Sequence, residues 1–449
     1  MEDHLKIIND PYVSGDERLA ALKAVREIYG ISSDNSGEIN NHIHTIYSFS
    51  PYTPSMAAMQ AVDAGLNAAG SVDHDSISAA NEMVKACAIL GIGGCAGFEV
   101  RASFKTCADG KPGPFTDRKI NSPDSAGFAY MTVQGIPKPS IPAVTEFLKP
   151  IRGARLNRIM AMTVSANALL KDAGLAEIDF VHDIYSKSKY KEGGGITERH
   201  LLAAAAYKII EGFGKGAGLT DSLKRKMGIT VPPALSAYLC DFNNQHYLYD
   251  LLGILKTEFL PEIFIIPDEK ECPPVYRITS FAESVCAIPA YAYLGDVASS
   301  PTGDKRAEKF EDDFIDDLFS EISRIGFRAV TYMPPRNTLN QLKKIQQLSR
   351  QWGFMEISGV DINSSRQFFG CPEILQDEFY HLVDTTWALI AHERLASVDK
   401  KYGLFSHNNP YNSMKLPELF ELYADIGKNL DLYHPEESAA SVAVQLDKG

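Results

Sequence analysis

Hydrophobic and polar positions follow two different periods in the first hundred residues. Stretches that read as short strands lie at 38–44, 67–75 and 92–100. The stretches between them, 54–66 and 76–91, repeat their apolar residues at helical spacing, and the second ends at Gly91. Strands that alternate with helices through short connections are typical of a parallel sheet, which we therefore predict here.

The same alternation returns in the last third of the chain. Strand-like runs occupy 284–295, 327–333 and 354–362. Helical spacing predicts helices at 5–30, 304–326, 338–353, 378–397 and 416–430. The helix at 304–326 is amphipathic, and its apolar face carries Phe310, Phe314, Leu318, Ile322 and Ile325.

The middle of the chain lacks this rhythm. The stretch 105–127 is rich in Gly, Pro, Asp and Ser, and 190–214 is a glycine-rich loop followed by a clear helix. We interpret this region as an insertion, a lid or cap, rather than as part of a barrel. The predicted parts are an N-terminal helix, a first barrel segment, the insertion, a second barrel segment and C-terminal helices, at 1–36, 37–104, 105–270, 271–370 and 371–449.

Composition narrows the class of protein. The chain has 449 residues, 45% of them hydrophobic, so it can form a core. A net charge of −13 argues against binding of a nucleic-acid polymer or an anionic membrane, although a bound cation would still allow a small anionic substrate. The 7 cysteines include no CxxC pair, which argues against a disulfide framework. With no apolar leader or membrane-length run, we expect a cytoplasmic protein.

Histidines and carboxylates gather where the predicted strands end. His42 and His44 are two apart, so a strand would point both imidazoles to the same side. The next strand ends in Asp73–His74–Asp75, the third carries Glu99 and a late one carries Asp361. Because parallel barrels build their sites at strand ends, these side chains are expected to converge. Histidine with carboxylate suits Zn²⁺, Mn²⁺ or Fe²⁺.

Each of these groups also has an ordinary structural explanation. An isolated HxH is a weak signal, Asp75 suits a helix cap, and Glu99 suits an ion pair. Their conjunction is stronger, because each group ends a strand that is otherwise apolar. Several carboxylates buried at one barrel mouth would need a cation.

Four stretches of the sequence resemble the polymerase and histidinol phosphatase (PHP) superfamily. They are "HIHTIYSFSP", "SVDHDS", "GFEV" and "GVDIN", beside the family patterns HxHT, DH[DN], GxE and GxDxH. The likeness covers about residues 37–104 and 275–370. It implies a distorted (β/α)7 TIM-like barrel with up to three metal ions, and hydrolysis of phosphate esters by metal-activated water.

The resemblance also implies a set of metal ligands. His42, His44, Glu99 and Asp361 would hold the first metal ion. Glu99 would bridge towards a second ion, and His74 would belong to a third.

Three positions depart from the family pattern. Ser50 stands where the family has Asp or His, Asn363 replaces a histidine ligand, and Tyr291 or Tyr293 stands where a histidine would lie. The third metal site is therefore expected to be weakened or lost. We predict one bound divalent ion, with room for a second.

Further candidates complete the predicted site. His200 could bind the second ion, because related PHP phosphoesterases place an Arg/His pair at the start of a helix, and His182 is an alternative. Arg101, Arg199 and Arg366 could bind phosphate. The ordinary alternatives are a helix-start or surface histidine and an exposed ion pair.

These features lead to two hypotheses from different classes. The first is a metal-dependent phosphoesterase that acts on a small phosphorylated metabolite or nucleotide. Asp73, His74 and Asp75 would be catalytic, with either aspartate accepting a proton or orienting His74. The second is a catalytically weakened metal- or ligand-binding module. Hydrolysis of an amide is a weaker third alternative, because related barrels share the same layout.

Overall fold

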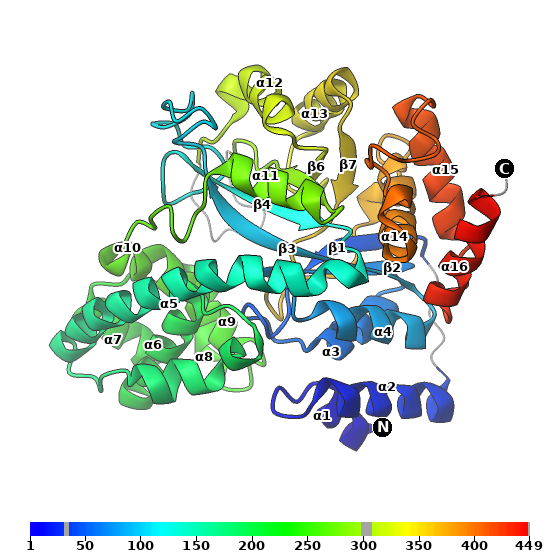
Figure 1. The fold of residues 1–449 in the computed structure, drawn as a ribbon. Coiled ribbons are helices and arrows are strands. Elements are labelled where there is room, and N and C mark those ends of the chain that lie inside the picture. Colours follow the sequence, from blue (N-terminus) through cyan, green and yellow to red (C-terminus); the bar gives the residue numbers. More distant parts are fainter. Residues whose placement is uncertain (31–35, 298–307, 448–449) are drawn as a thin grey trace.

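Seven strands form one sheet that curls into a nearly closed barrel in the computed structural model, which describes residues 1–30, 36–297 and 308–447 (Figure 1). They lie in chain order: β1 (Ile39–Ile43), β2 (Ala68–His74), β3 (Gly93–Ser103), β4 (Phe128–Gln134), β5 (Ile288–Ala292), β6 (Ala329–Tyr332) and β7 (Met355–Ser358). Ile43 pairs with Ile362, beyond the end of β7, and so joins the two edges. The predicted distorted TIM-like barrel is confirmed.

Strand β4 departs from the prediction. The strands β1–β3 and β5–β7 are parallel within each group, as expected, but β4 is antiparallel to both β3 and β5. It also lies within 105–270, where no barrel strand was predicted, so that part of the prediction was wrong. An antiparallel neighbour needs no crossover helix, and the strand–helix rhythm therefore stops while the sheet continues.

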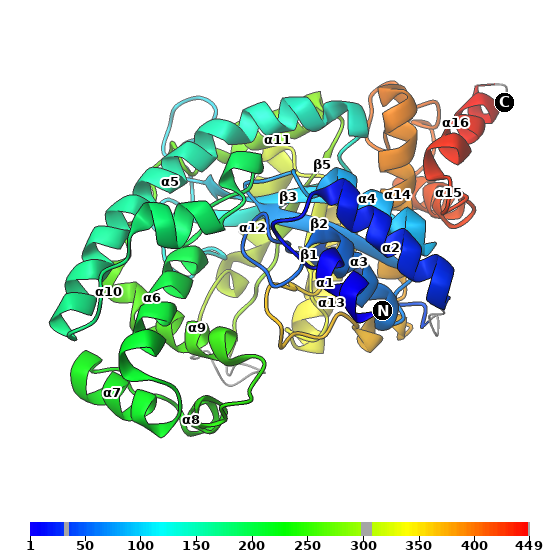
Figure 2. The same ribbon diagram turned by 90° about the horizontal axis from the view of Figure 1, so that it is seen from below.

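Helices cover the outside of the barrel, as Figures 1 and 2 show. Those next to the strands are α3 (Pro54–Asp63), α4 (Ala80–Leu90), α11 (Val275–Ser284), α12 (Ile315–Ile325), α13 (Leu339–Trp352) and α14 (His381–Val398). Two C-terminal helices, α15 (Leu416–Lys428) and α16 (Pro435–Leu446), pack against α14. None of the helices in the described ranges has the length and apolar character needed to cross a membrane.

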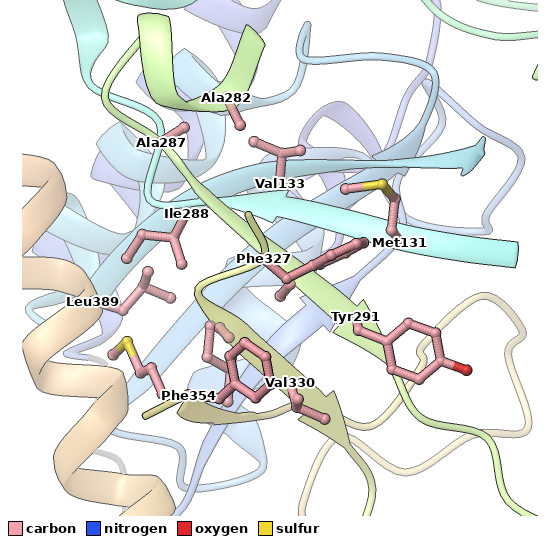
Figure 3. Packing of buried hydrophobic residues seen from close by; sticks show 14 of the residues in the cluster. Met131, Val133, Ala282, Ala287, Ile288, Tyr291, Phe327, Val330, Phe354 and Leu389 are labelled. Atoms are coloured by element: carbon pink, nitrogen blue, oxygen red, sulfur yellow. The ribbon is translucent and has the colours of Figure 1, made fainter. Parts of the chain in front are cut away.

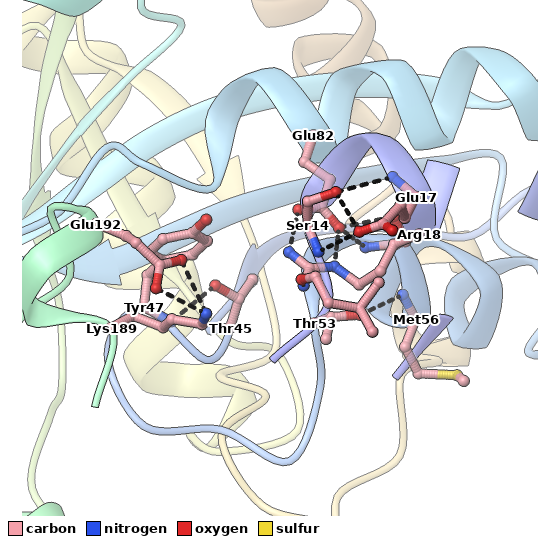
Figure 4. Close-up of polar contacts among 12 residues, drawn as sticks. Ser14, Glu17, Arg18, Thr45, Tyr47, Thr53, Met56, Glu82, Lys189 and Glu192 are labelled. Carbon is pink, nitrogen blue, oxygen red and sulfur yellow. Dashed lines mark hydrogen bonds and ion pairs between the residues drawn. The ribbon is translucent and has the colours of Figure 1, made fainter. Parts of the chain in front are cut away.

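Two predicted helices differ in extent from the observed ones. The stretch 5–30 forms two helices, α1 (Glu2–Ile8) and α2 (Gly15–Tyr29), because Ser14 and Glu17 form a capping box that starts a new helix (Figure 4). The helix predicted at 304–326 is observed only as α12, and its first residues, 304–307, lie outside the described part of the chain. Leu318 and Ile322 of its apolar face are fully buried.

The barrel core fills the space between the sheet and these helices. Figure 3 shows one part of it, where Met131 and Val133 of β4 lie near Ile288 and Tyr291 of β5 and near Phe327. The side chains are packed on both faces of the strands, as expected for a sheet covered by helices.

A second core lies in a group of helices that we call the helical lobe, residues 141–263. It comprises α5 (Ile141–Asp172), α6 (Glu198–Phe213), α7 (Ala217–Met227), α8 (Pro233–Cys240), α9 (Tyr247–Glu258) and α10 (Leu260–Ile263). Helix α5 joins the two cores, because Leu148 packs in the barrel core and Leu170 in that of the lobe (Figure 2). The predicted mainly helical insertion thus corresponds to this lobe.

Candidate metal centre

Five predicted ligands meet at the carboxyl-end mouth of the barrel, and we call this group the metal centre: His42, His44, His74, Glu99 and Asp361. His44 Nε2 lies 3.3 Å from Asp361 Oδ1 and 3.9 Å from Glu99 Oε2. His42 Nε2 is 3.9 Å from Glu99 Oε1, and His74 Nδ1 is 2.7 Å from Glu99 Oε2. The strand ends therefore bring together side chains that are more than 300 positions apart in the chain.

The centre divides into two overlapping groups of ligand atoms. One consists of His42, His44 and Asp361, and the other of His44, His74 and Glu99, with the atoms of each group within 4.8 Å of one another. His74 Nδ1 and Glu99 Oε2 are close, yet they lack the alignment of a hydrogen bond. Imidazole and carboxylate in this arrangement suit a divalent metal ion, and the residues present fit the group that the sequence implied.

Burial and mutual charge set the ionisation of the centre. Burial lowers the pKa of His42, whereas the hydrogen bond and charge of Asp361 outweigh burial at His44 and raise its pKa. Burial alone would raise the pKa of Glu99, but the charge of His74 outweighs it and the pKa falls to about 2. The pKa of Asp361 is also lowered, because hydrogen bonding to His44 outweighs burial. Both carboxylates are ionised at neutral pH.

Asp73 belongs to neither ligand group and organises the loop after β1. Its carboxylate accepts hydrogen bonds from the backbone N–H and the hydroxyl of Thr45, both at 2.7 Å, and from Ser48 at 2.5 Å. Ser48 Oγ is in turn 3.2 Å from His44 Nδ1. Asp73 therefore holds the ring of His44 in orientation through Ser48, in the way that outer carboxylates orient metal-binding histidines.

Asp75 and Arg101 belong instead to a buried ion-pair network beside the metal centre. The network comprises Asp75, Arg101, Arg155, Arg158, Glu198 and Glu271. Asp75 Oδ2 lies 3.1 Å from Arg155 Nη1, and Arg101 Nη2 lies 2.9 Å from Glu271 Oε1. Carboxylates already neutralise Arg101 in a buried ion pair, which differs both from the predicted phosphate contact and from the exposed ion pair that was its alternative.

Arg199 lies beside the metal centre. It donates a hydrogen bond to Asn363 Oδ1, and Asn363 Nδ2 donates to Asp361 Oδ1 at 2.7 Å. Its guanidinium carbon is 5.5 Å from the ring centroid of Phe49 and 6.0 Å from that of Tyr249. Asn363, which departs from the family pattern, thus links Arg199 to a predicted metal ligand.

Arg366 and the two alternative histidines lie away from the ligand groups. Arg366 forms an ion pair with Asp250 in the helical lobe, and its guanidinium carbon lies 4.0 Å from the ring centroid of Tyr238. His200 caps α6, where its Nδ1 accepts the backbone N–H of Thr197, and burial lowers its pKa to about 3. His182 is exposed.

The tyrosines in place of a family histidine are structural. Tyr291 donates a hydrogen bond to Glu311 at 3.0 Å, and Tyr293 donates to Asp312 at 2.6 Å. Ser50 is buried, and its hydroxyl has no hydrogen-bond partner among the described residues.

The sequence analysis did not predict two residues that lie at the mouth of the barrel. Tyr130 lies on β4, with its ring centroid 5.8 Å from that of His74, and it was missed because its strand was missed. Arg336 follows β6 in the loop "MPPR". Its position just after a predicted strand was a usable signal, because site residues of barrels occupy such positions.

Comparisons with known proteins show limited similarity. No protein-family model matches the sequence, and no curated protein matches it. An amidohydrolase from Chromobacterium violaceum, solved with bound sulfate and no metal, has 16% identity and a TM-score of 0.48, with 74% of this chain and 90% of that chain covered. A protein named as a metal-dependent phosphoesterase from Bifidobacterium adolescentis has 15% identity and a TM-score of 0.47, with 77% and 95% covered. These values assign no function to this chain.

Proposed function

We propose that this protein is a metal-dependent phosphoesterase of the PHP type that hydrolyses a small phosphorylated metabolite or nucleotide. The observation that supports the proposal most directly is the convergence of three imidazoles and two carboxylates at one barrel mouth. An arginine stands next to them, as a phosphate-binding site requires. The net charge of −13 favours a small substrate over a nucleic-acid polymer.

His44 belongs to both ligand groups, but it can bind a metal ion in only one of them. Its Nδ1 faces Ser48, so only Nε2 is left, and one nitrogen lone pair binds one ion. We assign His44 to the group with His42 and Asp361. His74 and Glu99 would then remain for a second ion. Zn²⁺, Mn²⁺ and Fe²⁺ all suit these ligands.

A bound divalent ion would supply Lewis acidity and an activated water. The chain's own residues would bind and orient the phosphate. Arg199 would donate to a phosphate oxygen, and Asn363 holds it next to Asp361. Asp73 and Asp75 are already engaged with hydroxyls and with Arg155, which leaves His74 as the predicted catalytic residue that faces the centre. With only the first ion bound, His74 would accept the proton, and Glu99 lies 2.7 Å from its Nδ1.

Activity and metal binding test this proposal together. The protein loaded with Mn²⁺ or Zn²⁺ should hydrolyse an aryl phosphate, and His42→Ala should abolish the activity while circular dichroism stays unchanged. His407→Ala is the matched control, because His407 is exposed and pairs with Glu283 at the surface. Full activity in His42→Ala would defeat the assignment.

A second candidate is a binding module without turnover. Asn363 already hydrogen-bonds to Arg199 and Asp361, and Ser50 offers a hydroxyl where the family pattern has a better ligand. Elemental analysis of the purified protein discriminates between the two functions. Less than one metal ion per chain, together with no hydrolysis across a panel of phosphate esters, would favour the module.

A further inference from the structure

The arginines near the barrel mouth differ in how their charge is balanced. Arg101 pairs with Glu198 and Glu271, and Arg366 pairs with Asp250. Arg336 makes no such contact within the described part of the chain. Its guanidinium makes one hydrogen bond there, from Nε to the backbone carbonyl of Leu294 at 3.1 Å.

The fold holds Arg336 between three strand ends. It follows β6, and its partner Leu294 lies just after β5. Asn337 donates to the same carbonyl at 2.9 Å, which fixes the loop. Asp361 lies close by on the other flank, because its backbone N–H faces the sulfur of Met333 at 3.4 Å. Arg336 therefore lies on the β5–β6 side of the mouth, whereas Arg199 belongs to α6 and contacts Asn363 next to Asp361.

Within the described part of the chain, Arg336 has the electrostatic environment of a cation without a carboxylate partner. Burial lowers its pKa, and Glu311, Asp361 and Glu308 raise it only through longer-range charge. The side chain is half-buried, and the two terminal nitrogens have no hydrogen-bond partner in the described ranges. A half-buried guanidinium with open donors is well suited to bind an anion bidentately.

We infer that Arg336 is a second anion-binding residue of this mouth, which contacts the phosphate of a monoester substrate from the side not reached by Arg199. The substrate class rests on the proposed function. Two guanidinium groups beside a cation match the dianion that a phosphate monoester carries near neutral pH, since its second pKa is about 6. A phosphodiester carries only one charge and would use one of the two arginines.

Binding of phenylphosphonate, an inert analogue of a monoester dianion, tests this inference. The analogue is titrated by calorimetry into the Mn²⁺-loaded protein and into the R336M variant, whose metal content is measured in parallel. We expect R336M to weaken binding about tenfold or more, because charge-assisted bidentate hydrogen bonds are lost. R350M is the matched control, since Arg350 is exposed in the last turn of α13 and should bind like the wild type.

The variant R336K tests the same inference if R336M fails to fold. R336K keeps the charge but loses the planar fork, so its affinity should fall about threefold. Wild-type affinity in a folded R336M, or in R336K if only that variant folds, would overturn the inference, as would no binding to the wild type.

The proposed function fails separately from this inference. A wild-type protein that hydrolyses no phosphate ester, yet binds phenylphosphonate in an Arg336-dependent way, would refute the phosphoesterase and leave the anion site standing. Hydrolysis with unchanged KM in R336M and R336K would refute the inference alone.

Discussion

Two buried clusters of charge lie side by side at the barrel mouth, and they are balanced differently. The ion-pair network contains three arginines and three carboxylates, so its formal charges cancel. The metal centre sets two ionised carboxylates against imidazoles, of which His42 has its pKa lowered by burial. The network pairs each of its charges internally, whereas the metal centre gathers imidazole and carboxylate groups that suit a divalent cation.

The ion-pair network and the metal centre also differ in the role that we expect for each. The network joins β3 to α5 and α6, and so fastens the helical lobe to the barrel. The metal centre contributes ligands from the barrel alone. Breaking the network should therefore cost stability, and breaking the metal centre should cost metal affinity and activity.

The largest effect is expected from Glu271→Gln. Glu271 is 1% exposed and contacts Arg101, Arg155 and Arg158, so its neutralisation leaves buried arginines without a full partner. We expect a loss of about 3–5 kcal/mol in the free energy of unfolding, measured by urea denaturation. Glu436→Gln is the matched control: its pair with Lys138 is exposed and should contribute less than about 1 kcal/mol. Equal losses of unfolding free energy in both variants would show that the buried network stabilises the protein no more than an exposed ion pair does.

The next effect is expected from Asp361→Asn. It removes one charged ligand but keeps the oxygen that accepts from Asn363, so this hydrogen bond should survive the change. We expect metal affinity to fall at least about 100-fold, measured by competition with a chelating dye. Asp316→Asn, which changes an exposed residue of α12, is the control. Unchanged metal affinity in Asp361→Asn would mean that the two clusters do not differ as described.

The smallest effect is expected from Ser48→Ala. This change removes the hydroxyl that connects Asp73 to Nδ1 of His44 and leaves every predicted ligand in place. Metal affinity should fall about tenfold, at the lower end of the range for partners that orient a ligand. Ser441→Ala on α16 is the control, because its hydroxyl only contacts its own helix. A loss of metal affinity in Ser48→Ala as large as that expected for Asp361→Asn would show that Ser48 itself approaches the ion.

The sequence predicted the barrel and the metal centre for the same reason. Parallel strands with apolar interiors have a recognisable period, and their carboxyl ends must meet at one rim. His42, His44, His74, Glu99 and Asp361 could therefore be grouped by their positions at strand ends. Because strand β4 was missed, Tyr130 was not predicted as a site residue, although the sheet places it beside His74.

The arginines show where local reasoning stops. Arg101 lies two residues after Glu99, and this position alone suggested a role in the site. Its partners, Glu198 and Glu271, come from the lobe and from the segment after it, about 100 and 170 positions away. No local pattern specifies such a pairing, so a phosphate contact and an ion pair look the same in the sequence.

The sequence by itself predicted the parallel strands on both sides of β4, the helical character of the lobe and the candidate ligands, because periodicity and strand ends are local properties of the chain. Only the tertiary structure decided which charges are cancelled and which are left open. That choice depends on contacts between segments distant in the chain, where burial makes each charge find a partner or remain available to a ligand. Asp75 and Arg101 form ion pairs with Arg155 and Glu198 of the lobe, while Arg336 has no carboxylate partner within the described part of the chain.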